Sequence, residues 1–89
     1  MDKYDLMILD IIQEFKSNHQ SLIKLGVLEE NYWKRIQDDE SLSVGKARIG
    51  ERITKLYLDG QIQNKSGYML TKKGRENLAH ASSRISQVA

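Results

Sequence analysis

The stretch Ser43–Gly60, SVGKARIGERITKLYLDG, is the part of this 89-residue chain from which the rest of the fold can be worked out. At about 100° per residue, its side chains separate onto two sides of a predicted helix. The apolar side holds Ile49, Ile53, Leu56 and Tyr57. The outward side holds Ala47, Arg48, Glu51 and Lys55, with Arg52 on the flank. Ser43 is the expected N-cap, and Gly60 is expected to take the left-handed conformation that ends a helix. The stretch therefore predicts an amphipathic helix with a cationic outer face.

The composition predicts one small globular domain over residues 1–89. Hydrophobic residues make up 39% of the chain and charged residues 29%, and a chain of this length supports a single hydrophobic core. No run approaches the roughly 18 apolar residues of a membrane span, and the first residues do not resemble a secretory signal, so we expect a cytoplasmic protein. The chain has no cysteine, which excludes disulfides and thiolate metal sites.

Charge is distributed unevenly, although the net charge is only +2. Residues 1–42 hold five Lys or Arg against nine Asp or Glu, whereas residues 43–75 hold eight basic residues against two acidic ones. A basic half of this kind indicates a polyanionic partner, with a solvated basic surface as the alternative interpretation. The acidic turn Asp38-Asp39-Glu40 would repel a phosphate backbone, so we expect it to face away from any nucleic acid.

The remaining elements follow from changes of hydrophobic period. Helical spacing predicts a first helix over about 2–17 and a second within 21–39, which Gly26 either breaks or delays until about residue 29. Period-two spacing at 61–63 and 68–71 predicts two strands joined by a tight turn, with Asn64 and Gly67 at positive φ. Ile62, Tyr68 and Leu70 are expected to face inward and Gln61, Gln63 and Lys65 outward.

A last helix over about 72–87 is expected to be capped by Thr71. Its apolar seam consists of Leu78, Ala81, Ile85 and Val88. That seam fits either packing on the first helix or pairing with a second copy of the chain. In the second helix, Tyr32 and Trp33 suit a core position better than a stacking platform for a nucleobase.

No enzyme site, cofactor or metal site is expected. His19 and His80 are the two histidines, and neither has a nucleophile or paired carboxylate at a catalytic spacing. Gly45-Lys46 lacks the preceding glycine of a phosphate-binding loop, and the Asp38–Glu40 run lacks the alternation and distal Glu of a calcium loop.

Two runs carry a resemblance to the winged helix-turn-helix family. IGERITKLYLDGQIQ resembles the end of a recognition helix and the start of a wing, and YMLTKKGRENL is similar to the L-T-x-x-G-R-x-x-L that closes the wing in many regulators. The chain looks most like small archaeal or phage-repressor-like transcriptional regulators. The resemblance implies a mainly α fold with a small β-hairpin (α+β): a three-helix core, a wing and a C-terminal helix.

The resemblance also implies where double-stranded DNA would bind, with helix 43–59 in the major groove and wing 61–71 on the backbone or minor groove. The positions facing base edges would be Ser43, Val44, Ala47, Arg48 and Glu51. The positions toward phosphates would be Lys46, Arg52, Lys55, Lys65, Lys72 and Lys73. Arg48 suits a bidentate pair with guanine, Ala47 or Val44 a thymine methyl, and Glu51 the amino group of cytosine. The expected function is sequence-specific transcription regulation.

The alternative is a winged-helix module that binds protein or RNA, because a fold does not fix its function. Exposed apolar residues on the outer face of the 43–59 helix would favour a protein partner, whereas a cationic face favours nucleic acid. A homodimer through the C-terminal helix would suit two half-sites on DNA.

Overall fold

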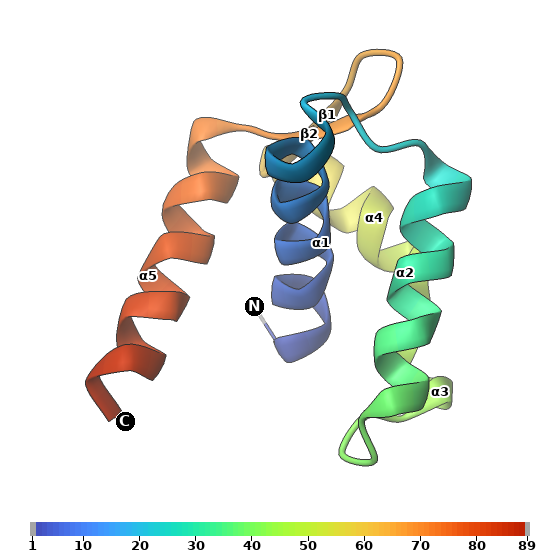
Figure 1. Ribbon diagram of the computed structural model, residues 1–89, viewed down its shortest axis with the longest axis vertical. Coiled ribbons are helices and arrows are strands. Elements are labelled where there is room, and N and C mark those ends of the chain that lie inside the picture. The colour runs from blue at the N-terminus through green and yellow to red at the C-terminus, as the bar shows by residue number, and fades with distance from the viewer. Residues whose placement is uncertain (1, 89) are drawn as a thin grey trace.

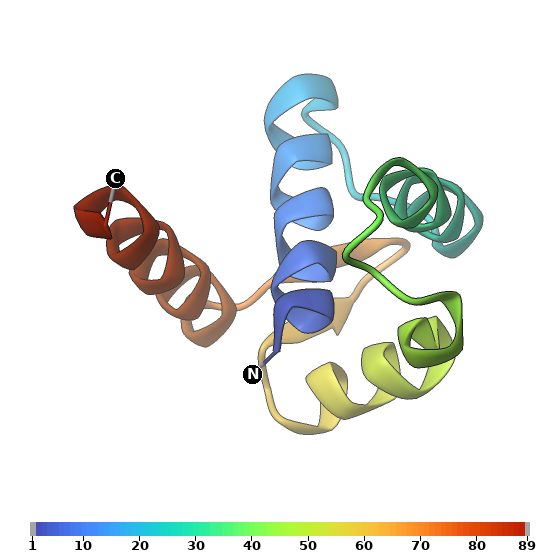
Figure 2. The ribbon, with the colours of Figure 1, turned by 90° about the horizontal axis from the view of Figure 1, so that it is seen from below.

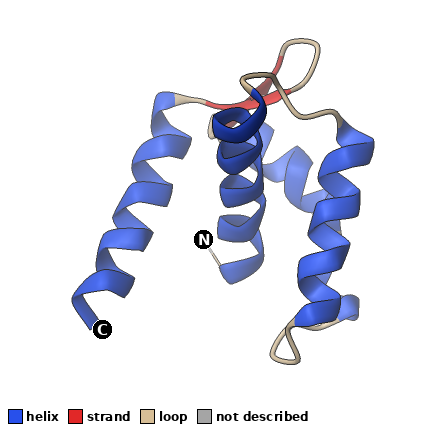
Figure 3. Cartoon of the chain, viewed as in Figure 1, coloured by secondary structure: helices blue, strands red, loops and turns tan. Residues whose placement is uncertain are grey.

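The computed structural model describes residues 2–88, with the side chains of residues 45, 46 and 82–88 left out of the description. It is mainly helical with one small antiparallel sheet, as Figures 1 and 3 show. The elements in chain order are α1 (Lys3–His19), α2 (Leu25–Asp38), α3 (Val44–Ala47), α4 (Ile49–Leu58), β1 (Ile62–Asn64), β2 (Tyr68–Leu70) and α5 (Lys72–Val88). The predicted α+β class is confirmed.

Helix α1 lies in the middle of the molecule, and the other elements surround it. Figure 2 shows α2 and α4 on one side of α1 and α5 on the other, and Figure 1 shows the hairpin across the top of the molecule. The largest fully buried side chains among the described residues come from several elements: Ile8, Leu9, Ile12, Ile23, Leu28, Tyr32, Leu56 and Ile62. One hydrophobic core therefore joins the first helices to the hairpin.

Helix α1 begins where expected but ends later than predicted. The Asp2 carboxylate caps its start by accepting from the Asp5 backbone N–H at 3.0 Å. The helix continues to His19, and Gln20 ends it in the left-handed conformation (φ 51°) while donating its backbone N–H to the Lys16 carbonyl. The predicted end near Ser17 is wrong because polar residues on a solvent-facing side do not interrupt a helix.

Helix α2 includes Gly26, so the predicted break or late start is also wrong. Gly26 lies in the first turn, where glycine costs less because the early N–H groups have no partner within the helix. Tyr32 is fully buried, and Trp33 is partly buried against the core with its ring edge-on to Tyr32 at 5.8 Å. Leu42 follows the helix and packs against the same core.

The predicted hairpin is confirmed, but β1 lies one residue later than expected, with Ile62 paired to Leu70 and Asn64 to Tyr68. Positive φ occurs at Gly67 (151°) as predicted, and also at Ser66 (62°). The positive φ predicted for Asn64 is wrong, because Asn64 ends β1 and instead accepts the Gly67 N–H through its side chain at 3.1 Å. Ile23 adds an isolated antiparallel bridge to Tyr68. The segment before α2 is thereby attached to β2, which pairs with β1 on its other side.

Gln61, expected to face outward, is buried with 4% of its surface exposed. Its side-chain amide donates to the Asp59 carboxylate at 2.8 Å and accepts from the Asn77 amide at 2.9 Å. Partners on both sides explain the burial, because a buried amide costs little free energy once its hydrogen bonds are made.

Helix α5 is capped as predicted, since the Thr71 hydroxyl accepts the Gly74 N–H at 3.2 Å. The helix packs against α1, and Leu78 contacts the core. Ile85 and Val88 lie outside the described side chains, so the homodimer stays a prediction. Within residues 2–88, the structure contains no helix that combines the length and apolar character needed to cross a membrane.

Candidate nucleic-acid interface

The predicted helix over 43–59 is two helices, and Arg48 separates them. Arg48 adopts the left-handed conformation (φ 36°, ψ 58°), ending α3 and preceding α4. Its carbonyl then accepts from the Arg52 N–H at 3.2 Å, which begins the second helix. Gly60, at φ 77°, follows α4 in the left-handed conformation as expected. The prediction of one continuous helix is wrong.

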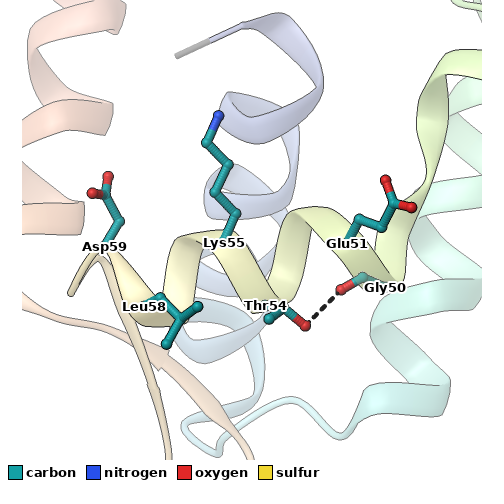
Figure 4. A pocket seen from close by; sticks show the side chains of 6 residues that line it. All are labelled: Gly50, Glu51, Thr54, Lys55, Leu58 and Asp59. Atoms are coloured by element: carbon teal, nitrogen blue, oxygen red, sulfur yellow. Dashed lines mark hydrogen bonds between the residues drawn. The ribbon is translucent and has the colours of Figure 1, made fainter.

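The exposed edge of α4 lies along an open surface pocket of about 590 Å³. Figure 4 shows its lining residues: Gly50, Glu51, Thr54, Lys55, Leu58 and Asp59. The Glu51, Lys55 and Asp59 side chains point to one side of the helix, and Leu58 to the other. The Thr54 hydroxyl donates to the Gly50 carbonyl at 3.0 Å, so it is held against its own helix.

The charges along this edge alternate in sign. Arg48 lies 3.6 Å from the Glu51 carboxylate, with about 70% of each side chain exposed. Lys55 follows as an exposed cation, and Asp59 follows Lys55 as an anion. The expected cationic outer face is therefore wrong for the described residues of α4, because their positive and negative charges balance.

Arg52 is the reason for that balance, since it turns into the protein. Its guanidinium pairs with the Asp2 and Asp5 carboxylates at 2.8 and 3.2 Å and stacks 4.7 Å from the centre of the Tyr4 ring. Only 18% of its side chain is exposed. The predicted phosphate contact of Arg52 is therefore replaced by a bridge between α4 and the start of α1.

The Arg52 bridge shifts the ionisation of the groups that form it. Partial burial opposes ionisation of Asp2, but the hydrogen bonds from the Asp5 N–H and the guanidinium outweigh it and lower the pKa of Asp2. Partial burial of the Arg52 guanidinium lowers its pKa, but the hydrogen bonds to Asp2 and Asp5 outweigh burial and raise the pKa of Arg52 overall. The ionised Asp2 carboxylate therefore stabilises the folded state when the pH is above the pKa that Asp2 has in the unfolded chain. This stabilisation is lost as the pH falls through the lower pKa of Asp2 in the folded state.

Ala47 is fully buried, so its predicted place on the outward side is wrong. Its carbonyl accepts from the Tyr32 hydroxyl at 2.8 Å and from Arg52 Nε at 2.7 Å. Tyr57, predicted to be buried, is instead 55% exposed. The left-handed turn at Arg48 explains the Ala47 error, because residues before it no longer follow the angular spacing of α4.

The residues before Arg48 differ in their accessibility. Val44 is 64% exposed, and Ser43 is exposed. Ser43 stands at the N-cap of α3, but within the described part of the chain its hydroxyl makes no capping hydrogen bond. Its backbone N–H donates to the Tyr4 hydroxyl at 2.7 Å. The Lys46 side chain lies outside the described atoms.

Two cations lie at the tip of the hairpin. Lys65 is exposed there, and the Lys24 ammonium group donates to the Ser66 carbonyl. Lys24 was not among the residues expected at this site, because a single lysine in a connecting segment forms no recognisable sequence pattern. The Ile23–Tyr68 bridge is what brings it to the tip.

The lysines at the start of α5 have different environments. Lys72 has 85% of its side chain exposed, 4.0 Å from the Glu76 carboxylate. Lys73 donates to the Asp59 carbonyl at 2.8 Å and lies 3.9 Å from its carboxylate. Lys73 thus ties α5 to the end of α4, and Lys72 is the more accessible of the two.

An exposed apolar area lies between α4 and the hairpin. Tyr57 and Leu58 have 55% and 78% of their surface exposed. A groove of about 380 Å³ beside them is lined by Ile53, Thr54, Tyr57, Leu58, Asn64 and Tyr68. Helical spacing predicted that Tyr57 would be buried, and no sequence pattern predicted this groove.

Among the described residues there is no group of three or more His, Cys, Asp or Glu side chains placed to hold a metal ion. A scan against protein-family models, a search of curated proteins and a search of solved structures each returned no match for this chain.

The Tyr32 hydroxyl provides a prediction at alkaline pH. Burial raises the pKa of Tyr32 to about 12, so the unfolded chain loses this proton first as pH rises above about 10. The stabilisation of the fold by the buried, neutral Tyr32 hydroxyl is complete below about pH 10 and is lost as the pH approaches about 12. Urea unfolding between pH 8 and 12 should show a steeper loss of stability in the wild type than in Tyr32→Phe. Parallel curves for the two proteins would contradict this assignment.

Proposed function

We propose that this chain is a winged-helix protein that binds double-stranded DNA, with Arg48 and the exposed edge of α4 in the major groove and the hairpin tip on the phosphate backbone. The element order supports the winged-helix assignment: helices α1, α2 and α4, then a two-stranded hairpin, then α5. A helix presented beside a hairpin is suited to a groove and its flanking backbone.

The observation that carries the proposal is the combination of an exposed Arg48 at the start of α4 with two lysines at the hairpin tip. A guanidinium with 69% exposure is accessible to the O6 and N7 atoms of guanine. Lys24 and Lys65 add positive charge where a phosphate strand would pass. The proposed contact set leaves out Ala47, which is buried, and Arg52, which pairs with Asp2 and Asp5. Val44, Glu51, Lys55 and Lys72 stay in the proposed contact set as exposed residues.

The balanced charges of α4 have a consequence for affinity. Because Glu51 and Asp59 offset Arg48 and Lys55, attraction to phosphate depends mainly on the hairpin and the start of α5. We therefore expect modest non-specific affinity for DNA and a shallow dependence of that affinity on salt. Each phosphate contact removed should reduce the slope of log affinity against log salt concentration by roughly one unit.

Selection of bound duplexes from a random pool, at 50 and 150 mM salt, tests the function directly. Enrichment of one sequence would support base reading, whereas equal recovery of all duplexes would contradict it. The selected duplex then serves to compare Arg48→Gly with Lys65→Ala. Glycine is used at residue 48 because it accepts the left-handed backbone without strain.

Arg48→Gly should reduce preference for the selected duplex by about 1–3 kcal/mol while leaving binding to scrambled duplex nearly unchanged. Lys65→Ala should weaken both duplexes alike and lower the salt slope by about one unit. Fluorescence anisotropy titrations at several salt concentrations measure both effects. Unchanged preference in Arg48→Gly would exclude Arg48 as a base-reading residue.

A protein partner is the second candidate, and the exposed Tyr57 and Leu58 favour it. A winged-helix module that binds another protein is expected to expose apolar residues on the outer face of α4. Equal recovery of all duplexes in the selection, together with weak binding at 150 mM salt, would favour this candidate over DNA.

A further inference from the structure

The short helix α3 is fastened at both ends by side chains from other helices. Before its first residue, the Ser43 N–H donates to the Tyr4 hydroxyl of α1 at 2.7 Å. At its last residue, the Ala47 carbonyl accepts from the Tyr32 hydroxyl of α2 at 2.8 Å and from Arg52 Nε of α4 at 2.7 Å. Three helices therefore hold one four-residue segment.

The fastening is buried and internally connected. Tyr4, Tyr32 and Ala47 are 5%, 0% and 0% exposed. Arg52 also stacks on the Tyr4 ring, so the groups at the two ends of α3 contact each other. Hydrogen bonds in such a site are costly to break, because a separated partner would be left buried without a replacement.

The fastening acts on the residue between α3 and α4 whose backbone departs from helical geometry. Arg48 follows Ala47 directly and holds φ 36°, a conformation that costs a non-glycine residue free energy unless its surroundings impose it. The Ala47 carbonyl belongs to the peptide unit that joins Ala47 to Arg48, and its two hydrogen bonds fix the direction of that unit. The direction in which the exposed Arg48 side chain leaves the protein depends on that peptide unit.

We infer that Tyr4, Tyr32 and Arg52 are positioning residues for DNA reading, which clamp α3 and thereby orient Val44 and Arg48 toward base edges. The inference rests on the proposed function and adds to it: sequence preference depends on buried residues that do not touch DNA. Holding a reading side chain in one direction lowers the entropy lost on binding. Non-specific affinity does not depend on that direction.

The test uses hydroxyl deletions in the full chain. Tyr32→Phe and Tyr4→Phe each remove one clamp bond. Asn31→Ala is the control on α2, because it removes the hydrogen bond from the Asn31 amide to the Val27 carbonyl at 2.8 Å and none of the clamp bonds. Each protein is first shown to be folded by its urea transition. Binding to the selected duplex and to scrambled duplex is then measured at one salt concentration.

We expect Tyr32→Phe to lower the ratio of selected to scrambled affinity about tenfold, the factor a single good base contact contributes. Binding to scrambled duplex and the salt slope should be unchanged, and Asn31→Ala should keep the full ratio. If Tyr32→Phe is not folded, Tyr4→Phe gives the result at the other end of α3. A folded clamp variant that keeps the wild-type ratio overturns the inference.

Amide hydrogen exchange without DNA separates failure of the clamp from failure of the proposed function. Loss of the clamp should raise exchange at residues 47–52 about tenfold or more relative to α2, since local opening becomes easier. A wild type without sequence preference, combined with this increase, would overturn DNA reading while showing that the clamp exists. Unchanged exchange in both clamp variants would overturn the clamp itself.

Discussion

Replacement of Arg52 by methionine is expected to lower the free energy of unfolding by about 3 kcal/mol at pH 7, because it leaves the Asp5 carboxylate buried without its cation. Asp5 has 4% of its side chain exposed and lies 3.2 Å from the guanidinium. Methionine keeps much of the length and apolar surface of the arginine stem, so the loss reports on charge and hydrogen bonding more than on packing. Urea unfolding at pH 7 measures it.

The expected loss comes mostly from the stranded carboxylate, and a second substitution tests that. Asp5→Asn removes the negative charge, so the double variant Asp5→Asn with Arg52→Met should recover part of the stability lost in Arg52→Met. Measured together with Asp5→Asn alone, the two variants complete a double-mutant cycle, which gives the coupling energy of the pair. A double variant less stable than Arg52→Met would show that the stranded charge is not the cause.

Arg35 offers a matched control on another surface. It pairs with Asp10 at 2.7 Å and Glu14 at 2.8 Å, but these carboxylates are 51% and 57% exposed. Solvated partners contribute little, so Arg35→Met should cost less than about 1 kcal/mol. Equal losses for Arg35→Met and Arg52→Met would mean that burial of Asp5 does not distinguish the two pairs.

The stability of Arg52→Met also bears on the proposed DNA contact. If Arg52 were a surface residue reaching a phosphate, its removal would weaken all duplexes and leave folding almost unchanged. Because Arg52 instead joins α4 to the first turn of α1, its removal should act first on folding. The two measurements together decide which role the residue has.

Local pattern predicted those parts of the fold that depend on neighbours in sequence. The apolar spacing of Ile49, Ile53 and Leu56 is confirmed by their burial. The Thr71 cap and the turn ending in Gly67 are likewise confirmed. These features follow from helical period, capping chemistry and turn geometry, all of which act over a few residues.

The candidate site was predicted less well, because its decisive contacts join distant residues. Arg52 pairs with Asp2, 50 residues away, and Ala47 accepts from Tyr32, 15 residues away. A helical wheel drawn from one segment contains no information about such partners. It therefore placed Ala47 and Arg52 outside and gave no sign of the left-handed turn at Arg48. The exposure of Arg48, Glu51 and Lys55 was predicted correctly.

Gln61 shows the same limit in the hairpin. Its polar side chain predicted an outward position, yet Asp59 and Asn77 satisfy its amide inside the protein. The first turn of α5 lies against this residue at Gly74. A Cβ atom at Gly74 would lie 2.1 Å from the Gln61 carbonyl oxygen and 3.1 Å from its carbonyl carbon.

Gly74→Ala is therefore expected to destabilise the protein by about 3 kcal/mol, at the upper end of the usual cost of overpacking. The Gln61 carbonyl cannot easily move aside, because it accepts the Thr71 N–H at 3.0 Å and its side chain is held at both ends. Alanine must instead push α5 away from the hairpin, which separates Asn77 from Gln61. Urea unfolding measures the cost.

Gly26→Ala is the control for this substitution, since a Cβ atom there meets no described atom within 4 Å. Both glycines lie in the first turns of helices, so intrinsic helix propensity favours alanine at each by up to about 1 kcal/mol. Gly26→Ala should accordingly be neutral or slightly stabilising, and only Gly74→Ala should lose stability. If Gly74→Ala instead matches Gly26→Ala, then α5 does not approach Gln61 in solution, and the Lys73 link between α5 and the end of α4 would be lost with it.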